Sequence, residues 1–427
     1  MSFSKNLSKL AGSLLIGGIA IASIGYLSLE AAAGGNLRIG KPLKLVAEND
    51  REVLLVSTPS LKQVRDFIQK VLPTNPGRYG YRRVFSPEVI RIDRAGKQTR
   101  LQFRRHQVNY SNAVTSEPQT LELLSFDSGN NRRWIAEPGT RTQPLFPNPK
   151  NPHQLFFQNS NSDVLYLLDT KTLKVQPINS EGLRAAIAKI RNLPPTNTEY
   201  KALLYWVSDP TWSPNGRQIA FSSNRDNFSD TAVWLHDIAK GKDIRVLARS
   251  GVTFRVHGWT ADNRILATEI NRDNSNYALL AINPATAQSQ QLAAGHFRAL
   301  SDDGNTLIYE TRPNKPYLAE VYALSLTTGK TQLLFKDNEA ERFTGGGVDF
   351  SADSQRIVML LGDTKSFRQT LLVYERQHGR AKRLPLPSER RLERRFGERL
   401  EWAGSRLLVP LANDRKLISE TLLMSLP

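Results

Sequence analysis

A repeated plan of about ten residues constrains the fold of this chain more than any other feature. It is clearest at Trp212, where an aromatic anchor precedes a Ser-Pro-Asn-Gly turn and an apolar run. The same order begins again at Trp259, Leu300 and Phe350, and a looser copy begins at Trp402. The anchors are 47, 41, 50 and 52 residues apart. A period in this range fits four short strands per unit, which is the size of a propeller blade.

Each recurring position of the repeat has a physical reason for its residue type. A hydroxyl residue follows each of the first four anchors, and Asn or Asp comes two positions later, so both can bond nearby backbone and stabilise a tight turn. The next position suits φ > 0 and is Gly or Asn in three units, so the fourth turn, with Ser354, is expected to be the least regular. The apolar strand after each turn is expected to be buried at Ile219, Leu266, Leu307 and Ile357.

A second hairpin follows the repeated turn in most units. "AVWLHDIAKGKDIRVL" from Ala232 and "AEVYALSLTTGKTQLLF" from Ala319 are examples, and runs of the same shape begin at Val89 and Val164. We therefore predict an all-β fold, a β-propeller of four-stranded blades with short helical insertions, over residues 80–427. Seven blades are favoured, and six to eight are possible.

The pattern resembles the WD-like repeats of TolB-type β-propeller proteins, whose units carry a Trp-Ser-Pro-Asp-Gly turn before an apolar strand. The match is strongest from Trp212 to Arg225, with Asn215 in place of the usual Asp. It covers roughly residues 205–427 and extends towards residue 80 by hairpin shape alone. The resemblance implies a protein-binding scaffold of the cell envelope with a small α/β N-terminal domain.

The N-terminus has the features of an export signal. Lys5 and Lys9 precede an uncharged stretch from Leu10 to Leu29, and an Ala-Ala-Ala sequence ends at position 33. Residues 1–33 are thus expected to be a cleaved signal peptide or an uncleaved membrane anchor, and either places the protein outside the cytoplasm. Residues 34–79 are expected to form a small strand-helix segment, with a helix over 60–73 capped by Ser60 and Gln63.

The two ends of the chain are expected to complete one blade. The unit around 80–103 lacks a clear inner strand, and the unit after Trp402 lacks a clear outer one. Pairing of the termini removes an exposed edge and fastens the ring.

Composition excludes several chemistries. The chain has no cysteine, so thiolate catalysis, zinc-thiolate sites and iron–sulfur clusters are absent. None of its six histidines has zinc-protease spacing, and no hydrolase nucleophile elbow or phosphate loop occurs. We expect no cofactor and no metal.

The formal charge of +18 points to anionic partners. The basic stretch at 376–399 is expected to include an exposed helix over 388–400, after another helix at 182–193. Four arginines at helical spacing form the predicted anion-binding patch: Arg390, Arg391, Arg394 and Arg395. Export makes nucleic acid a poor candidate.

Residues a few positions before the anchors are expected to gather at one mouth of the ring. These candidate ligand-binding residues are Asp209, Arg255, His257, His296, Arg298 and Glu398. Two functions remain open. The favoured one is an exported, non-catalytic scaffold that binds an envelope protein or an anionic surface. The alternative is an exported enzyme that acts on an anionic glycan, which needs paired acids or a His–acid pair at the mouth.

Overall fold

The structure is a computed structural model of the 427-residue chain. It describes residues 31–32, 36–48, 52–71, 86–93, 97–113, 118–128, 131–138, 145–158, 164–178, 207–226, 230–273, 276–313, 318–366, 368–387, 390–392, 400–403, 406–413, 415–416 and 418–425.

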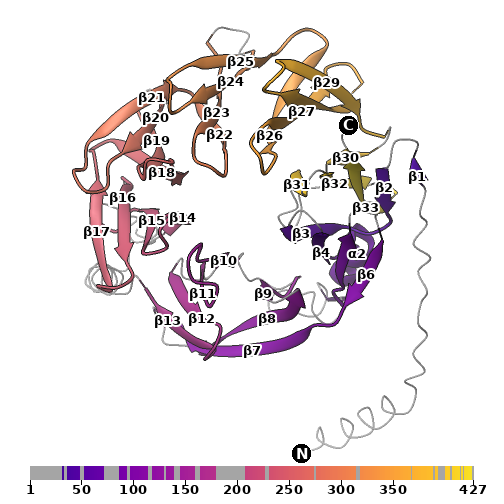
Figure 1. Ribbon diagram of the computed structural model, residues 1–427, viewed down its shortest axis with the longest axis horizontal. Helices are drawn as coiled ribbons and strands as arrows, with labels where there is room; N and C mark the ends of the chain where they lie inside the picture. The colour runs from indigo at the N-terminus through magenta and orange to yellow at the C-terminus, as the bar shows by residue number, and fades with distance from the viewer. Residues whose placement is uncertain are drawn as a thin grey trace, which may run out of the picture.

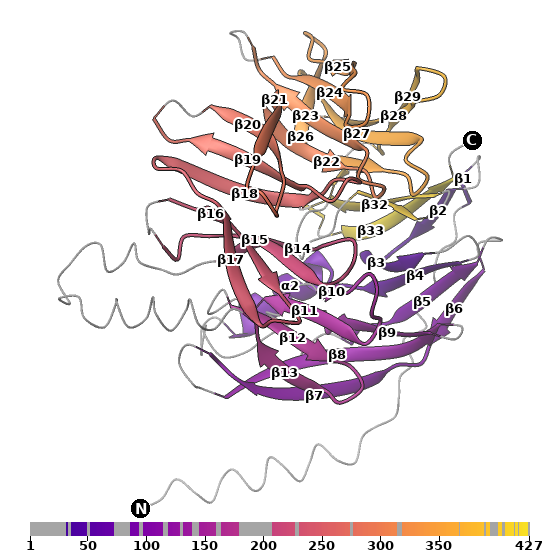
Figure 2. The same ribbon diagram turned by 60° about the vertical axis from the view of Figure 1, so that its left-hand side comes forward.

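The described strands form eight sheets, which are arranged as blades in a ring (Figure 1). The fold is therefore the predicted all-β propeller, with eight blades where seven were favoured. We number the blades 1 to 8 in chain order, from the sheet that begins with β3 to the sheet that contains the last strand, β33. Figure 2 shows the same ring turned by 60°, with many of the strands seen along their length.

The four anchors of the strict repeat belong to blades 4 to 7. In each of these blades four antiparallel strands pair in chain order, from the inner strand near the axis to the outer strand at the rim (Figure 1). Blade 4 contains β14 (Val207–Trp212), β15 (Gln218–Ser223), β16 (Ala232–Asp237) and β17 (Lys242–Leu247). Blade 5 contains β18 (Val252–Trp259), β19 (Ile265–Asn271), β20 (Tyr277–Ile282) and β21 (Ser289–Ala294). Blade 6 contains β22 (His296–Leu300), β23 (Thr306–Thr311), β24 (Glu320–Ser325) and β25 (Thr331–Lys336). Blade 7 contains β26 (Glu341–Phe350), β27 (Arg356–Asp363), β28 (Gln369–Glu375) and β29 (Arg380–Pro385).

The first three blades are less regular. Blade 1 contains β3 (Leu43–Glu48), β4 (Glu52–Ser57), β5 (Val89–Asp93) and β6 (Gln98–Leu101). Blade 2 has three described strands, β7 (Arg104–Ser111), β8 (Pro118–Ser128) and β9 (Asn131–Ala136). Blade 3 contains β10 (Phe146–Pro147), β11 (Gln154–Gln158), β12 (Leu165–Asp169) and β13 (Lys174–Pro177). Figure 1 places β7 at the rim and β9 nearest the axis, so blade 2 runs inwards whereas its neighbours run outwards.

Blade 8 is built from both ends of the chain, as expected for ring closure. Strand β33 (Ile418–Ser425) pairs on one side with β32 (Arg406–Asn413) and on the other with β2 (Asn36–Ile39). The strand that closes the ring is thus β2, and the unit around 80–103 instead receives its inner strands from β3 and β4. The boundary expected between residues 79 and 80 falls between β4 and β5, which pair in one sheet. The expected cleavage site, after residue 33, follows β1 (Ala31–Ala32), which pairs with β2.

The anchors and second strands are buried as predicted. Trp212, Trp259 and Phe350 are each less than a tenth exposed. The four second-strand residues are completely buried: Ile219, Leu266, Leu307 and Ile357. Each blade buries these side chains against its neighbour, so the core consists of apolar layers between adjacent sheets.

The repeated turn is closed by hydrogen bonds among its own residues. Ser301 Oγ donates to Asp303 Oδ1 at 2.5 Å and accepts from the Thr306 N–H at 2.9 Å. Ser351 makes the same two bonds, at 2.5 and 2.9 Å. The expectation that the turn at Ser354 is the least regular is wrong, because Ser354 takes φ 56° and keeps the turn bond to Ser351 at 2.7 Å. Serine occupies the left-handed region there at a conformational cost that glycine does not have.

One predicted helix is present, and another is partly contradicted. Helix α2 (Leu61–Val71) has the expected cap, in which the Ser60 N–H donates to Gln63 Oε1 at 2.8 Å. The helix expected over 182–193 lies outside the described residues. Within 388–400, β30 (Arg391–Leu392) is a short strand that pairs with β32, so the chain is extended at the point where the helix was expected to begin. Residues 393–399 lie outside the described part. No helix in the described part of the chain is long and apolar enough to cross a membrane.

Candidate functional site

The inner strands of blades 4 to 7 all bulge shortly before their anchors. In β14, Asp209 and Pro210 lie opposite Phe221 alone. Strand β18 has one extra residue, His257, and β22 has one, Arg298. The two residues that flank each of them pair with consecutive residues of the adjacent strand, so the extra residue has no position opposite it. In β26 four residues, 344–347, lie opposite one residue of β27. Bulges re-aim side chains and occur next to functional sites, and three of these four contain a residue predicted from the sequence.

Asp209 and Arg255 form an ion pair between blades 4 and 5. Asp209 has φ 52°, a left-handed conformation that is uncommon for a residue other than glycine. Arg255 Nε lies 3.3 Å from Asp209 Oδ2, and 56% of the Arg255 side chain is exposed. The aspartate carboxylate is thereby occupied by a cation, and the guanidinium group remains largely open to solvent.

His257 is held between two blades in its neutral form. Its Nε2 lies 2.6 Å from Thr268 Oγ1, and its ring stacks on Phe297 of blade 6 at 3.9 Å between centroids. Burial lowers the pKa of His257 to about 4; the nearby Asp209 carboxylate opposes this effect and Arg255 adds to it. The imidazole is therefore uncharged near pH 7, with its described hydrogen bond made to a hydroxyl group.

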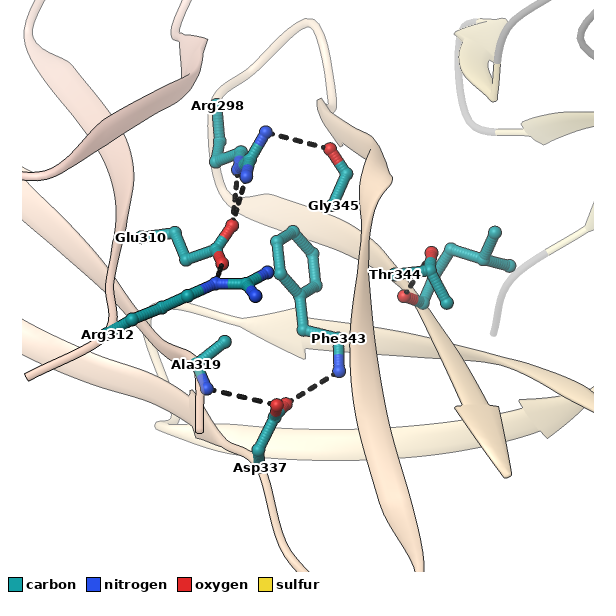
Figure 3. Close-up of polar contacts among 9 residues, drawn as sticks. Arg298, Glu310, Arg312, Ala319, Asp337, Phe343, Thr344 and Gly345 are labelled. Carbon is teal, nitrogen blue, oxygen red and sulfur yellow. Dashed lines mark hydrogen bonds and ion pairs between the residues drawn. The ribbon is translucent and has the colours of Figure 1, made fainter. Parts of the chain in front are cut away.

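Arg298 belongs to a second charged cluster, between blades 6 and 7 (Figure 3). Its Nε donates to Glu310 at 2.7 Å, its Nη2 also bonds Glu310, and its Nη1 donates to the Gly345 carbonyl at 3.0 Å. Arg312 Nε donates to the other oxygen of Glu310 at 2.6 Å. The Glu310 side chain is completely buried, so two cations surround one buried carboxylate.

His296 lies beside this cluster. The register pairs it with Glu310, and its ring lies 4.1 Å from that of Tyr277. Burial is the main effect that lowers the pKa of His296; Arg298 lowers it further, and Glu310 opposes this. His296 therefore adds no positive charge to the cluster at neutral pH.

Neither His257 nor His296 forms an ion pair with an acid in the described part of the chain. Within the described ranges, the His–acid pairs are His236 with Asp243, at 2.7 Å between β16 and β17, and His378 with Glu375, at 3.6 Å after β28. Both lie away from the inner strands. No group of three or more histidine and acidic residues in the described part could hold a metal ion.

The remaining predicted residues are Glu398 and the four arginines of the basic stretch. Glu398, Arg394 and Arg395 lie outside the described residues. Arg390 Nε donates to Glu420 at 2.8 Å, and only 12% of its side chain is exposed. Arg391 is exposed on β30. The predicted helical arrangement does not hold for Arg390 and Arg391, because β30 pairs with β32 at this point.

Sequence reasoning missed Glu310 and Arg312. The prediction rested on positions just before the anchors, on the inner strands. An antiparallel hairpin also brings the end of the second strand beside the start of the first. The sequence Glu310-Thr-Arg312, directly after a buried apolar strand, was the signal for these two residues.

Comparisons with known proteins concern the fold. No known protein family matches the chain, and no curated protein sequence matches it. Among solved structures, TolB from Acinetobacter baumannii is 13% identical, with 75% of this chain and 79% of that one covered and a TM-score of 0.37. An oligogalacturonate lyase from Vibrio parahaemolyticus is 11% identical, with 77% and 98% covered and a TM-score of 0.49. A puromycin-hydrolyzing peptidase from Mycobacterium tuberculosis is 15% identical over 86% of this chain but 49% of its own, with a TM-score of 0.44. These are similarities of fold alone; the predicted β-propeller itself is confirmed by the eight sheets of the structure.

Proposed function

We propose that this chain is an exported, non-catalytic β-propeller scaffold that binds an acidic protein or another anionic partner at the cell envelope. Its binding surface is the mouth formed by the inner strands of blades 4 to 6, where Arg255 and Arg298 lie. The contacts between blades support this role, because Asp209, His257 and Arg298 are each held by a residue of the neighbouring blade.

One observation carries the proposal: the two carboxylates that lie beside Arg255 and Arg298 are already bound by arginine. Asp209 pairs with Arg255, and Glu310 pairs with Arg298 and Arg312. A general base needs an available carboxylate or a histidine oriented by an acid. A cationic surface with occupied acids favours the binding of anions over the hydrolysis or elimination of a glycan.

Arginine also suits the proposed partner. Its planar group donates two parallel hydrogen bonds to a carboxylate. A partner held mainly by apolar contacts has less support: the exposed large hydrophobic residues in the described ranges are Ile244 and Leu333, on the outer strands of blades 4 and 6.

Export rests on the N-terminal sequence. Two lysines, an uncharged apolar stretch and three alanines favour a secretory signal or an anchor. Fractionation of the native host and N-terminal sequencing test this part, and a soluble cytoplasmic protein that starts at Met1 contradicts it.

The binding role is tested with a mouth variant and a rim variant of equal charge. Arg255→Gln removes a guanidinium group at the mouth, and Arg380→Gln removes an exposed one on β29. We expect the full-length protein to be retained on immobilised polyglutamate at low salt, and Arg255→Gln alone to weaken this retention. Equal weakening by both variants assigns binding to the diffuse net charge and contradicts the proposal. Depolymerisation of polygalacturonate or another anionic glycan supports the enzyme alternative.

A further inference from the structure

We propose that Arg298, Glu310 and Arg312 form a site for an oxyanion, a carboxylate or a phosphate group, in which the two terminal nitrogens of Arg312 bind the ligand. The inference rests on the proposed function and deepens it, because it names the chemical group that one part of the same mouth accepts.

The charge of the cluster is the first support. Glu310 is completely buried and carries one negative charge, whereas Arg298 and Arg312 carry two positive charges. His296 is held neutral by burial and by these same arginines, so it does not alter this balance. A partly buried surplus of one positive charge attracts a counter-anion.

The hydrogen bonds of the two arginines are the second support. Arg298 uses Nε and both terminal nitrogens within the protein, on Glu310 and on the Gly345 carbonyl. Arg312 uses Nε alone, and within the described part of the chain its terminal nitrogens have no hydrogen-bond partner (Figure 3). These nitrogens are two adjacent donors on a side chain that is 46% exposed.

Glu310 explains why Arg312 can act as a pre-oriented donor. Its Oε1 fixes the Nε of Arg312, while its Oε2 is occupied by Arg298. Fixing Nε limits the rotation of the planar group before the ligand arrives, which reduces the entropy lost on binding. A fork of this geometry matches the two oxygens of a carboxylate or a phosphate.

The experiment follows His296 by NMR in the full-length chain, with His296→Gln used to assign its signal. Sodium acetate and inorganic phosphate are titrated separately at constant ionic strength, with chloride making up the balance. We expect a saturable shift of the His296 signal and a rise in its pKa, because the bound anion offsets the positive charge of the two arginines. The tighter of the two titrations identifies the group as carboxylate or phosphate.

Two variants of Arg312 test the donor geometry. Arg312→Gln removes the charge and leaves Glu310 paired with Arg298, so the fold is expected to persist. Arg312→Lys keeps the charge but loses the fork. Both are expected to weaken anion binding on the order of ten-fold or more, and Arg380→Gln on the rim leaves it unchanged. In addition, Arg312→Gln alone raises the pKa of His296 without any anion.

Three results overturn the site: no saturable shift with either anion, an equal shift with chloride, or unchanged affinity in Arg312→Gln. Full affinity in Arg312→Lys overturns the role of the fork. Loss of the anion site with intact retention on polyglutamate leaves the proposed function standing. Anion binding at Arg312 in a protein that does not bind polyglutamate through the mouth leaves the anion site standing and contradicts the proposed function.

Discussion

Blade 8 and blades 4 to 7 hold their strands together by different means. In blades 4 to 7 the repeated turn is closed by bonds that span at most five residues, as for Ser301 with Asp303 and Thr306. In blade 8 the bonds join the two ends of the chain. Glu420 binds both Arg38 and Arg390, and Thr421 Oγ1 accepts from the Leu43 N–H at 2.8 Å.

The regular blades are therefore specified by local sequence, whereas ring closure depends on contacts between distant residues. A turn that bonds to itself leaves a recognisable pattern in the sequence, whereas contacts between residues more than 370 positions apart leave none. The proposed binding mouth lies on the regular blades and not on the blade that closes the ring.

The largest effect is expected from deletion of residues 416–427. This removes β33, which lies between β2 and β32 in the sheet of blade 8. Both neighbours lose the strand that joins them and the ring opens, so we expect the cooperative thermal transition to be lost in calorimetry. An unchanged melting temperature shows that ring closure does not depend on shared termini.

A point variant sharpens this test. Glu420→Gln leaves the largely buried Arg390 and the partly exposed Arg38 without their carboxylate, which costs about 3–5 kcal/mol of unfolding free energy. Glu341→Gln breaks the more exposed pair with Arg383 and costs less than about 1 kcal/mol. Urea unfolding of the two variants measures the contrast, and equal losses contradict a special role for blade 8.

Removal of an anchor is expected to have a similar effect within a regular blade. Trp259→Ala leaves a cavity between blades, at a cost of about 3–5 kcal/mol. Trp259→Phe is expected to cost much less, because the buried Trp259 Nε1 has no hydrogen-bond partner among the residues that the structure describes. Trp212→Phe is the matched comparison, since Trp212 Nε1 donates to the Phe146 carbonyl at 2.9 Å. A cost for Trp259→Phe above that for Trp212→Phe contradicts this account of the anchors.

The seam between blades 7 and 8 is expected to depend on pH. Asp349 Oδ2 accepts from the Trp402 N–H at 2.9 Å, and burial raises the pKa of Asp349 from 3.8 to about 7, with Glu401 and Asp302 adding to the rise. The folded protein then binds more protons than the unfolded chain between these values. Its stability therefore falls as pH rises from about 4 to about 7 and is constant above that range.

Asp349→Asn tests this seam. The variant cannot ionise but retains an oxygen that can accept from Trp402. We expect it to be more stable than the parent at pH 8, by on the order of 1 kcal/mol or more, with a smaller difference at pH 4. Urea unfolding across this pH range measures both effects, and parallel curves for parent and variant contradict the predicted pKa.

The smallest effects are expected at the fourth position of the repeated turn, with opposite signs. Ser354→Gly relieves a left-handed φ and is expected to stabilise by about 1 kcal/mol. Gly304→Ala is expected to destabilise by more than this, because its Cβ would lie 2.6 Å from the Ala261 nitrogen of blade 5. Thermal unfolding of both variants provides the measurement, and the same sign for the two contradicts equivalent turns.

The sequence predicted the regular blades well and the closing blade incompletely. Trp212, Trp259 and Ile357 occupy recurring positions whose residue types have local physical reasons. Their burial is confirmed. The shared blade was foreseen, but the pairing of β2 with β33 was not, because the short run at 36–39 has no strong strand pattern of its own.

The candidate site was predicted in part for the same reason. Asp209, His257 and Arg298 were found from their distance to the anchors. The bulges that contain them depend on the register between strands, which spacing alone does not give. Glu310 and Arg312 reach the site through the antiparallel partner strand, and Arg390 was assigned to solvent because its ion pair with Glu420 crosses blade 8.

Hydrogen–deuterium exchange of the full-length protein, with and without polyglutamate, tests the central claim most directly. Binding at the mouth predicts that added protection is concentrated at the bulged inner strands β14, β18 and β22, near Asp209, His257 and Arg298. The outer strands β25 and β29 and blade 8 are predicted to exchange as before. Protection confined to β29 or to the β30 region of blade 8 would contradict the claim that the regular blades carry the binding surface.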